Sequence, residues 1–195
     1  GIPEVEFLEF PYGEFTLDVP WKEQIVSLVR RVKPDIVITQ DPHHAQHDLD
    51  PDRRIIALLY TEAFALAGRD WHVEECGGYD PHLVPNIYYM TPEHANCVVE
   101  ISTTFELKQQ ALATLGSQLE FSAEMIEKKT SPEALRHMLS NYDEIKENKR
   151  DLGLALHTQF DLALALTHGL AGHSGIVMGE AYRREGVFKI DKLPG

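Results

Sequence analysis

The stretch that decides the fold is Pro34-Asp-Ile-Val-Ile-Thr-Gln-Asp-Pro-His-His-Ala-Gln-His-Asp-Leu-Asp-Pro-Asp-Arg-Arg54. In residues 35–39, Asp35 is followed by the β-branched run Ile-Val-Ile-Thr, which is typical of a largely buried parallel strand. Asp50 and Pro51 then indicate a helix start, because Asp is a good N-cap and Pro suits the first helical position. In open α/β sheets, ligands bind outside the carboxyl ends of the strands. The loop between strand and helix is therefore the first candidate for a metal or polar-substrate site, and it carries His43, His44, His47, Asp41, Asp48 and Asp50.

Strand and helix patterns alternate along the rest of the chain. Before residue 70 they predict a strand over 4–10, a helix over 18–33, the strand over 35–39 and a helix over 50–68. Beyond it they predict strands over 86–90 and 97–101, a helix from Thr103 or Thr104 to about 115, a charged helical excursion over 122–150, a helix over 152–170 and a last strand or short helix over 176–183. Alternating strands and helices predict one three-layer α/β domain over 1–195, with a mainly parallel sheet flanked by helices.

Composition narrows the possible partners. The chain has 195 residues and a net charge of −13, which argues against a nucleic-acid footprint of clustered Lys and Arg. No apolar run approaches the roughly 20 residues of a membrane-spanning helix. Cys76 and Cys97 show no C-x-x-C spacing, so we expect reduced thiols in a cytoplasmic protein. A small-molecule substrate is the expected partner, and a homo-oligomer is left open.

Several segments, taken in order, carry a family resemblance: Phe7-Leu-Glu-Phe-Pro-Tyr-Gly-Glu14, Lys33-Pro-Asp-Ile-Val-Ile-Thr39 with Asp41-Pro42, Tyr88-Tyr-Met-Thr-Pro-Glu-His-Ala-Asn-Cys-Val-Val-Glu-Ile-Ser102, Lys108 with Ser117-Gln118, and Gly179-Glu-Ala-Tyr-Arg183. They resemble the LmbE-like (PIG-L) N-acetylglucosaminyl deacetylases, which are zinc hydrolases with a Rossmann-like fold. The resemblance touches most of the chain except 122–150.

The chain departs from the family pattern in two places. The family's first motif, A-H-P-D-D, supplies two metal ligands and the general base and has no match here, so a strand–helix unit is expected to be missing before residue 1. The second motif, H-P-D-H-R, falls on Asp50-Pro51-Asp52-Arg53-Arg54. The resemblance thus places the catalytic positions at Asp50, Asp52 and Arg53, with Arg53 where the family has a metal-binding histidine. Arginine has no lone pair to give a metal.

Other residues supply the remaining candidates. His44 and His47 are the candidate Zn²⁺ ligands, with an oxygen from Asp48 or Asp50. His82 and Arg54 are candidate substrate contacts. Structural roles compete with these: Asp50 as an N-cap, Asp52 as an acid favoured by the helix dipole, and Arg53 in a surface ion pair.

Three functions are compatible with these residues. The first is a metal-dependent hydrolase that deacetylates an N-acetylated amino sugar or a related small molecule. The second is a catalytically inactive family member or fragment with a binding or assembly role, which Arg53 and the unmatched first motif favour. The third is a hydratase of small dicarboxylic acids on the same fold, because Arg53 and Arg54 suit carboxylates. A sheet without its first strand would also expose an apolar edge, so low stability is expected.

Overall fold

The sheet that positions the candidate site has the order β1-β2-β6-β3 in the computed structural model, which describes residues 2–48, 50–167, 171–172 and 175–185. Its strands are β1 (Val37–Gln40), β2 (Ile87–Met90), β3 (Cys97–Glu100) and β6 (Gly179–Glu185). Strands β1 and β2 are parallel, whereas β2 and β6 are antiparallel. The α/β class is confirmed. The described sheet is mixed where a mainly parallel one was expected, because β6 returns beside β2 in the opposite direction.

The chain divides into two compact units, residues 1–97 with 182–195 and residues 98–181. A single domain was expected from the sequence, and that stays a prediction.

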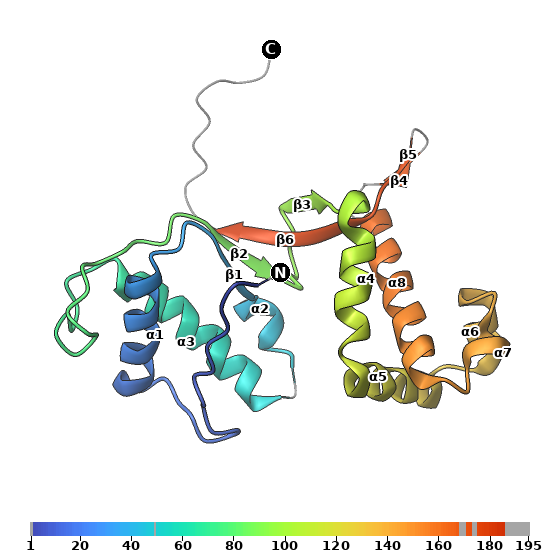
Figure 1. Cartoon of the computed structure of the whole chain (residues 1–195), viewed down its shortest axis with the longest axis horizontal. Coiled ribbons are helices and arrows are strands. Elements are labelled where there is room, and N and C mark those ends of the chain that lie inside the picture. Colours follow the sequence, from blue (N-terminus) through green and yellow to red (C-terminus); the bar gives the residue numbers. More distant parts are fainter. Residues whose placement is uncertain (1, 49, 168–170, 173–174, 186–195) are drawn as a thin grey trace, which may run out of the picture. The chain divides into compact units, whose positions relative to one another are not determined.

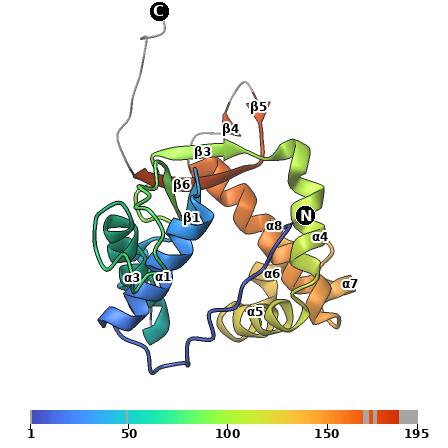
Figure 2. The same cartoon turned by 60° about the vertical axis from the view of Figure 1, so that its left-hand side comes forward.

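Two helices build the core of the first unit. Helix α1 (Val19–Val32) and helix α3 (Pro51–Ala67) pack side by side, and both views show them together (Figures 1 and 2). Their apolar residues recur at helical spacing and so fall on one face of each helix. The buried core comprises Ile25, Val26, Val29, Leu59, Ala63, Phe64, Ala67, Cys76 and Val84, and Val37 of β1 and Ile87 of β2 pack against it.

The ends of these helices follow from local chemistry. Helix α1 ends at Val32 because Lys33 takes a left-handed conformation with φ 50°, and its N–H donates to the Val29 carbonyl at 2.8 Å. Helix α3 begins at Pro51, and the Asp50 carboxylate accepts the N–H of Asp52 at 3.0 Å. The predicted N-cap is therefore confirmed.

The strand predicted over 4–10 is wrong. Residues 4–10 pair with none of the described strands, so the segment has no ladder of backbone hydrogen bonds. It lies along α1, where the Gln24 side chain donates to the Leu8 carbonyl at 3.3 Å. Leu8 packs against the core whereas Phe7 is 82% exposed. The alternating pattern reflects this one-sided contact with a helix.

A buried arginine fastens the connection after α3. Arg30 of α1 is fully buried, and its guanidinium donates to the carbonyls of Ala67 at 3.1 Å, Leu66 at 3.4 Å, Arg69 at 2.7 Å and Trp71 at 2.8 Å. These carbonyls end α3 or follow it, so they have no partner within the helix. One cation thus satisfies several of them at once.

The second unit is mainly helical. Its elements are a 3₁₀ turn η1 (Ser102–Thr104), helices α4 (Phe105–Ala113), α5 (Gly116–Lys129), α6 (Pro132–Met138), α7 (Tyr142–Ile145) and α8 (Lys149–Thr167), and a hairpin of β4 (Ala171–Gly172) and β5 (Gly175–Ile176). Helices α5 and α8 pack together in both views (Figures 1 and 2). None of the described helices is long and apolar enough to cross a membrane.

The charged excursion over 122–150 is helical, as predicted, and it has a core of its own. Ser131 caps α6 by accepting the N–H of Ala134 at 3.2 Å, which explains the break before Pro132. Leu135, Leu139 and Tyr142 are buried together with residues of α5 and α8. The excursion is therefore more than a solvated surface.

Candidate functional site

The centre of the candidate site is Asp41, the residue that follows β1. Its side chain is fully buried and accepts three hydrogen bonds: from the N–H of His43 at 2.9 Å, from the N–H of Glu93 at 3.3 Å and from Arg183 Nη2 at 2.8 Å. Burial alone raises the pKa of Asp41, but the hydrogen bonds from Arg183 and His43 outweigh it, so the pKa lies below its ordinary value. Asp41 is therefore an ionised carboxylate inside the fold.

Arg183 reaches this carboxylate from β6. Its partner in the register between β2 and β6 is Tyr89, and its guanidinium carbon lies 4.5 Å from the centre of the Tyr89 ring. A second ion pair joins Arg183 to Glu185, while the buried Nε has no hydrogen-bond partner among the described residues. The side chain is 13% exposed, so solvent screens the pair with Asp41 only weakly.

The histidines lie on an unexpected short helix. Asp41 caps helix α2 (Pro42–Ala45), which holds His43 and His44 on its exposed side. His47 follows it, is 76% exposed, and lies 3.2 Å from Glu93 on the loop after β2. Because β1 and β2 are parallel, both loops leave the same edge of the sheet.

The predicted catalytic acids are engaged by their neighbours. The Asp52 carboxylate accepts the N–H of Gly13 through both oxygens at 2.9 Å, which ties the turn after residue 10 to the start of α3. Asp50 caps the same helix, as described above. Both contacts are structural, and a catalytic role for Asp50 or Asp52 stays a prediction.

Arg53 forms ion pairs with two acids at the start of α3. Its Nη1 lies 2.9 Å from Asp48 Oδ2, and its Nε lies 3.7 Å from Asp50 Oδ2. Arg54 donates to the Asp48 carbonyl at 3.3 Å. A hydrogen bond from the Asp50 N–H and the one from Arg53 lower the pKa of Asp48. The structure therefore brings Asp48, Asp50, Arg53 and Arg54 together at the start of α3.

The structure does not bring His82 to this edge of the sheet. His82 Nε2 lies 2.9 Å from the Pro34 carbonyl oxygen, and its backbone N–H donates to the Ala67 carbonyl at 2.8 Å. Pro34 precedes β1, whereas Asp41 follows it, so the two sites lie at opposite ends of the strand. A substrate contact for His82 stays a prediction, and the geometry lends it no support.

The described residues do not fit a zinc ion. Among residues 2–48, 50–167, 171–172 and 175–185, no three or more His, Cys, Asp or Glu side chains are grouped so that they could hold a metal. Arg53, where the resemblance places a histidine ligand, pairs with Asp48. His44 and His47 stay candidate donors, and the described part of the chain groups no third donor with them.

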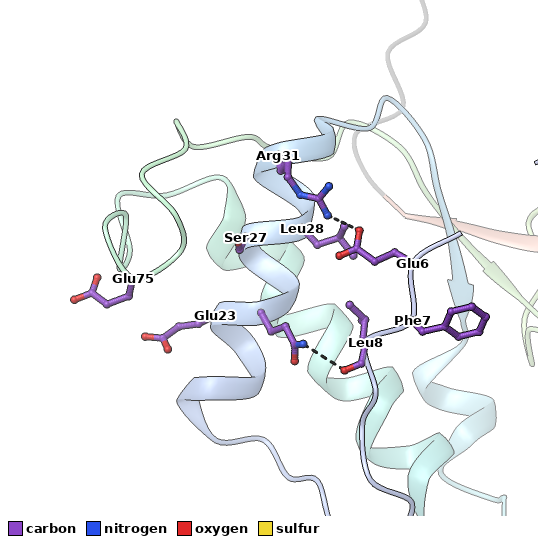
Figure 3. Close-up of a pocket in the computed structure, with 9 residues that line it drawn as sticks. Glu6, Phe7, Leu8, Glu23, Ser27, Leu28, Arg31 and Glu75 are labelled. Carbon is purple, nitrogen blue, oxygen red and sulfur yellow. Dashed lines mark hydrogen bonds and ion pairs between the residues drawn. The ribbon is translucent and has the colours of Figure 1, made fainter. Parts of the chain in front are cut away.

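A groove elsewhere in the first unit has a different character. It has a volume of about 320 Å³ and lies between the extended residues 6–8 and α1, as Figure 3 shows. Glu6 pairs with Arg31 there, as the dashed line in Figure 3 shows. The Gln24 side chain donates to the Leu8 carbonyl. Polar groups of the groove are thus bonded to one another, and they fasten the segment to the helix.

Comparison with solved structures defines the class of fold. The chain superposes on N,N'-diacetylchitobiose deacetylase from Pyrococcus horikoshii with a TM-score of 0.55 and 16% identity, covering 91% of this chain and 55% of that chain. It superposes on GalB, the 4-carboxy-2-hydroxymuconate hydratase from Pseudomonas putida KT2440, with a TM-score of 0.53 and 14% identity, covering 91% and 62%. At such identities the likeness establishes a shared α/β fold.

A sequence relative makes the comparison more specific. The diacetylchitobiose deacetylase of Thermococcus kodakarensis is 28% identical over 120 residues, which are 60% of this chain and 45% of the relative. The resemblance to the LmbE-like deacetylases is therefore confirmed. The matched part spans less than half the length of that relative. No family model matches the chain.

Residue patterns alone missed the partners of the histidine loop. The sequence places Arg183, Glu93 and Tyr89 only within the segments that carry the resemblance, and it indicates no contact between them and the loop. Arg183 is 142 residues from Asp41, so no local spacing indicates the pair. The position of Glu93 in the sequence could have indicated its contact, because Glu93 follows the strand predicted over 86–90 and His47 follows the strand predicted over 35–39, in a mainly parallel sheet.

Proposed function

We propose that this protein is an N-deacetylase acting on an N-acetylated amino sugar. The observation that carries the proposal is the 28% identity to a diacetylchitobiose deacetylase over 120 residues. In the present chain, the loop after β1 places imidazoles and carboxylates at the carboxyl edge of the sheet, which is where α/β folds bind ligands.

Residues at this edge of the sheet could supply the groups that amide hydrolysis needs. Amide hydrolysis needs a group that takes the proton of the attacking water and a positive or hydrogen-bonding group at the developing oxyanion. Asp48, Asp50 and His47 are acids or bases within the loop, and Arg53 is a cation beside them. Arg53 is 56% exposed, so a substrate can reach it.

Zinc stays part of the proposal as a prediction. A zinc ion would polarise the amide carbonyl and acidify a bound water. His44 and His47 are the candidate donors, although the described residues alone do not complete a site.

The second candidate is a hydratase of small dicarboxylic acids. The similarity to a structure named as a 4-carboxy-2-hydroxymuconate hydratase favours it, together with two adjacent cations, Arg53 and Arg54, at the start of α3. Against it, Arg53 is already paired with Asp48, so a substrate carboxylate would have to displace that acid.

The deciding experiment measures acetate released from N,N'-diacetylchitobiose and from N-acetylglucosamine by the purified chain, before and after Zn²⁺ is added. We expect release from at least one substrate, and its loss in His47→Ala. His137→Ala is the matched control, because His137 is an exposed histidine of α6 in the other unit. Hydration of an unsaturated dicarboxylic acid without acetate release would favour the second candidate. No turnover of either class would contradict both and support a binding role.

A further inference from the structure

We propose that Asp41 and Arg183 are positioning residues, which hold the two loops of the candidate site in register with each other. The inference rests on the proposed function for its activity test, but its geometric basis is independent of the reaction. The sequence presents Asp41 only as one acid of the histidine loop, and it gives Arg183 no part in the candidate site.

Asp41 joins three separate parts of the first unit. It follows β1, it accepts the His43 N–H at the start of α2, and it accepts the Glu93 N–H on the loop after β2. The third contact, from Arg183, comes from β6. A single carboxylate thus fixes the backbone on both sides of the contact between His47 and Glu93.

Burial makes this arrangement rigid. Asp41 is 0% exposed, so neither water nor a surface cation can take over its contacts. Arg183 is held in turn by the Tyr89 ring, which is 3% exposed. Breaking one partner of a buried ion pair leaves the other uncompensated, which is costly.

The outer contacts are loose by comparison. His47 is 76% exposed and meets Glu93 at the surface, so this pair contributes little by itself. The relative position of the two loops therefore depends on Asp41 rather than on the histidines. If the loops held by Asp41 shift, the reactive groups on them shift as well. A displacement of about 1 Å can lower the reaction rate roughly 100-fold.

The first test needs no substrate. Selective labelling of histidines allows the imidazole signals of His43, His44 and His47 to be followed by NMR, together with the Glu93 amide. We expect Asp41→Asn to shift these signals. Arg183→Lys is the second variant, since it keeps the charge but not the planar guanidinium, and we expect a smaller shift of the same signals.

Asp161→Asn is the matched control for a general loss of stability. Asp161 is also a poorly exposed acid in an ion pair, 2.9 Å from Lys108, but it lies in the second unit. It should lower the melting temperature without moving the signals of the His43–His47 loop. If Asp41→Asn lowers the melting temperature and leaves these signals unmoved, Asp41 is only structural and the inference is overturned.

The second test uses acetate release. Because Asp41 is fully buried, Asp41→Asn should lower kcat by about tenfold to 100-fold and change KM little. An unchanged kcat in a folded variant overturns the inference. If the unaltered protein releases no acetate, the proposed function fails, whereas the NMR test still decides the positioning role.

Discussion

Gly153 of α8 lies against the backbone carbonyl of Leu119 of α5. A Cβ atom on Gly153 would stand 2.4 Å from that oxygen, which is far closer than atoms can approach. The two helices therefore touch backbone to backbone at this point, and only glycine permits it.

We expect Gly153→Ala to destabilise the protein by about 1–3 kcal/mol, because the overpacked contact outweighs the better helix propensity of alanine. Urea unfolding followed by circular dichroism measures the change. Gly116→Ala is the control: its Cβ would lie 2.8 Å from the guanidinium of Arg150, which is the end of a flexible side chain and can move. Equal losses in both variants would show that the close crossing does not matter.

Arg30 provides a second prediction about stability. Arg30→Met keeps the length of the side chain but removes the guanidinium from four carbonyls. Leu66, Ala67 and Arg69 keep a backbone N–H donor, whereas the Trp71 carbonyl has no other donor among the described residues, so we expect a loss of about 1–3 kcal/mol in the free energy of unfolding.

The neighbouring Arg31 is the control for this substitution. Arg31 pairs with Glu6 at the surface, so Arg31→Met should change stability little. Chemical denaturation of both variants compares the two sites. A small effect of Arg30→Met would mean that water replaces the guanidinium.

The Asp41 carboxylate predicts a loss of stability in acid. In the folded protein the pKa of Asp41 lies below its ordinary value of 3.8. The ionised carboxylate therefore adds its full contribution to the free energy of unfolding above pH 3.8, and this contribution is lost as the pH falls through the folded pKa. The difference in unfolding free energy between the unaltered protein and Asp41→Asn should therefore shrink below pH 3.8. Denaturation curves near neutrality and at several acid pH values measure it, and a constant difference would contradict it.

The metal prediction is tested by elemental mass spectrometry after zinc soaking and removal of free metal. If His44 and His47 bind zinc, His44→Ala and His47→Ala should each reduce the bound zinc, whereas His137→Ala should not. Zinc that survives both substitutions, or no zinc at all, would reject these two residues as ligands.

Sequence patterns predicted the helices well because their signals are local. Asp50 and Pro51 mark the start of α3, and Ser131 with Pro132 marks the start of α6. The strand predicted over 4–10 does not form, because alternating polar and apolar residues indicate burial on one side and do not distinguish a helix from a sheet as the partner. The candidate site was predicted only in part: the histidine loop is visible in the sequence, whereas its fixation by Arg183 depends on a return of the chain from a distant strand.

The attachment of residues 2–10 has a consequence for handling the protein. The segment runs along α1 without a strand partner, and Ile2, Val5 and Phe7 are all more than half exposed. Proteases bind their substrates as extended chains, and a segment without a ladder of backbone hydrogen bonds is cut before the folded body is. Limited digestion should therefore nick the chain before Gly13, where the bond to Asp52 secures the backbone, and should leave a resistant product that begins near that turn.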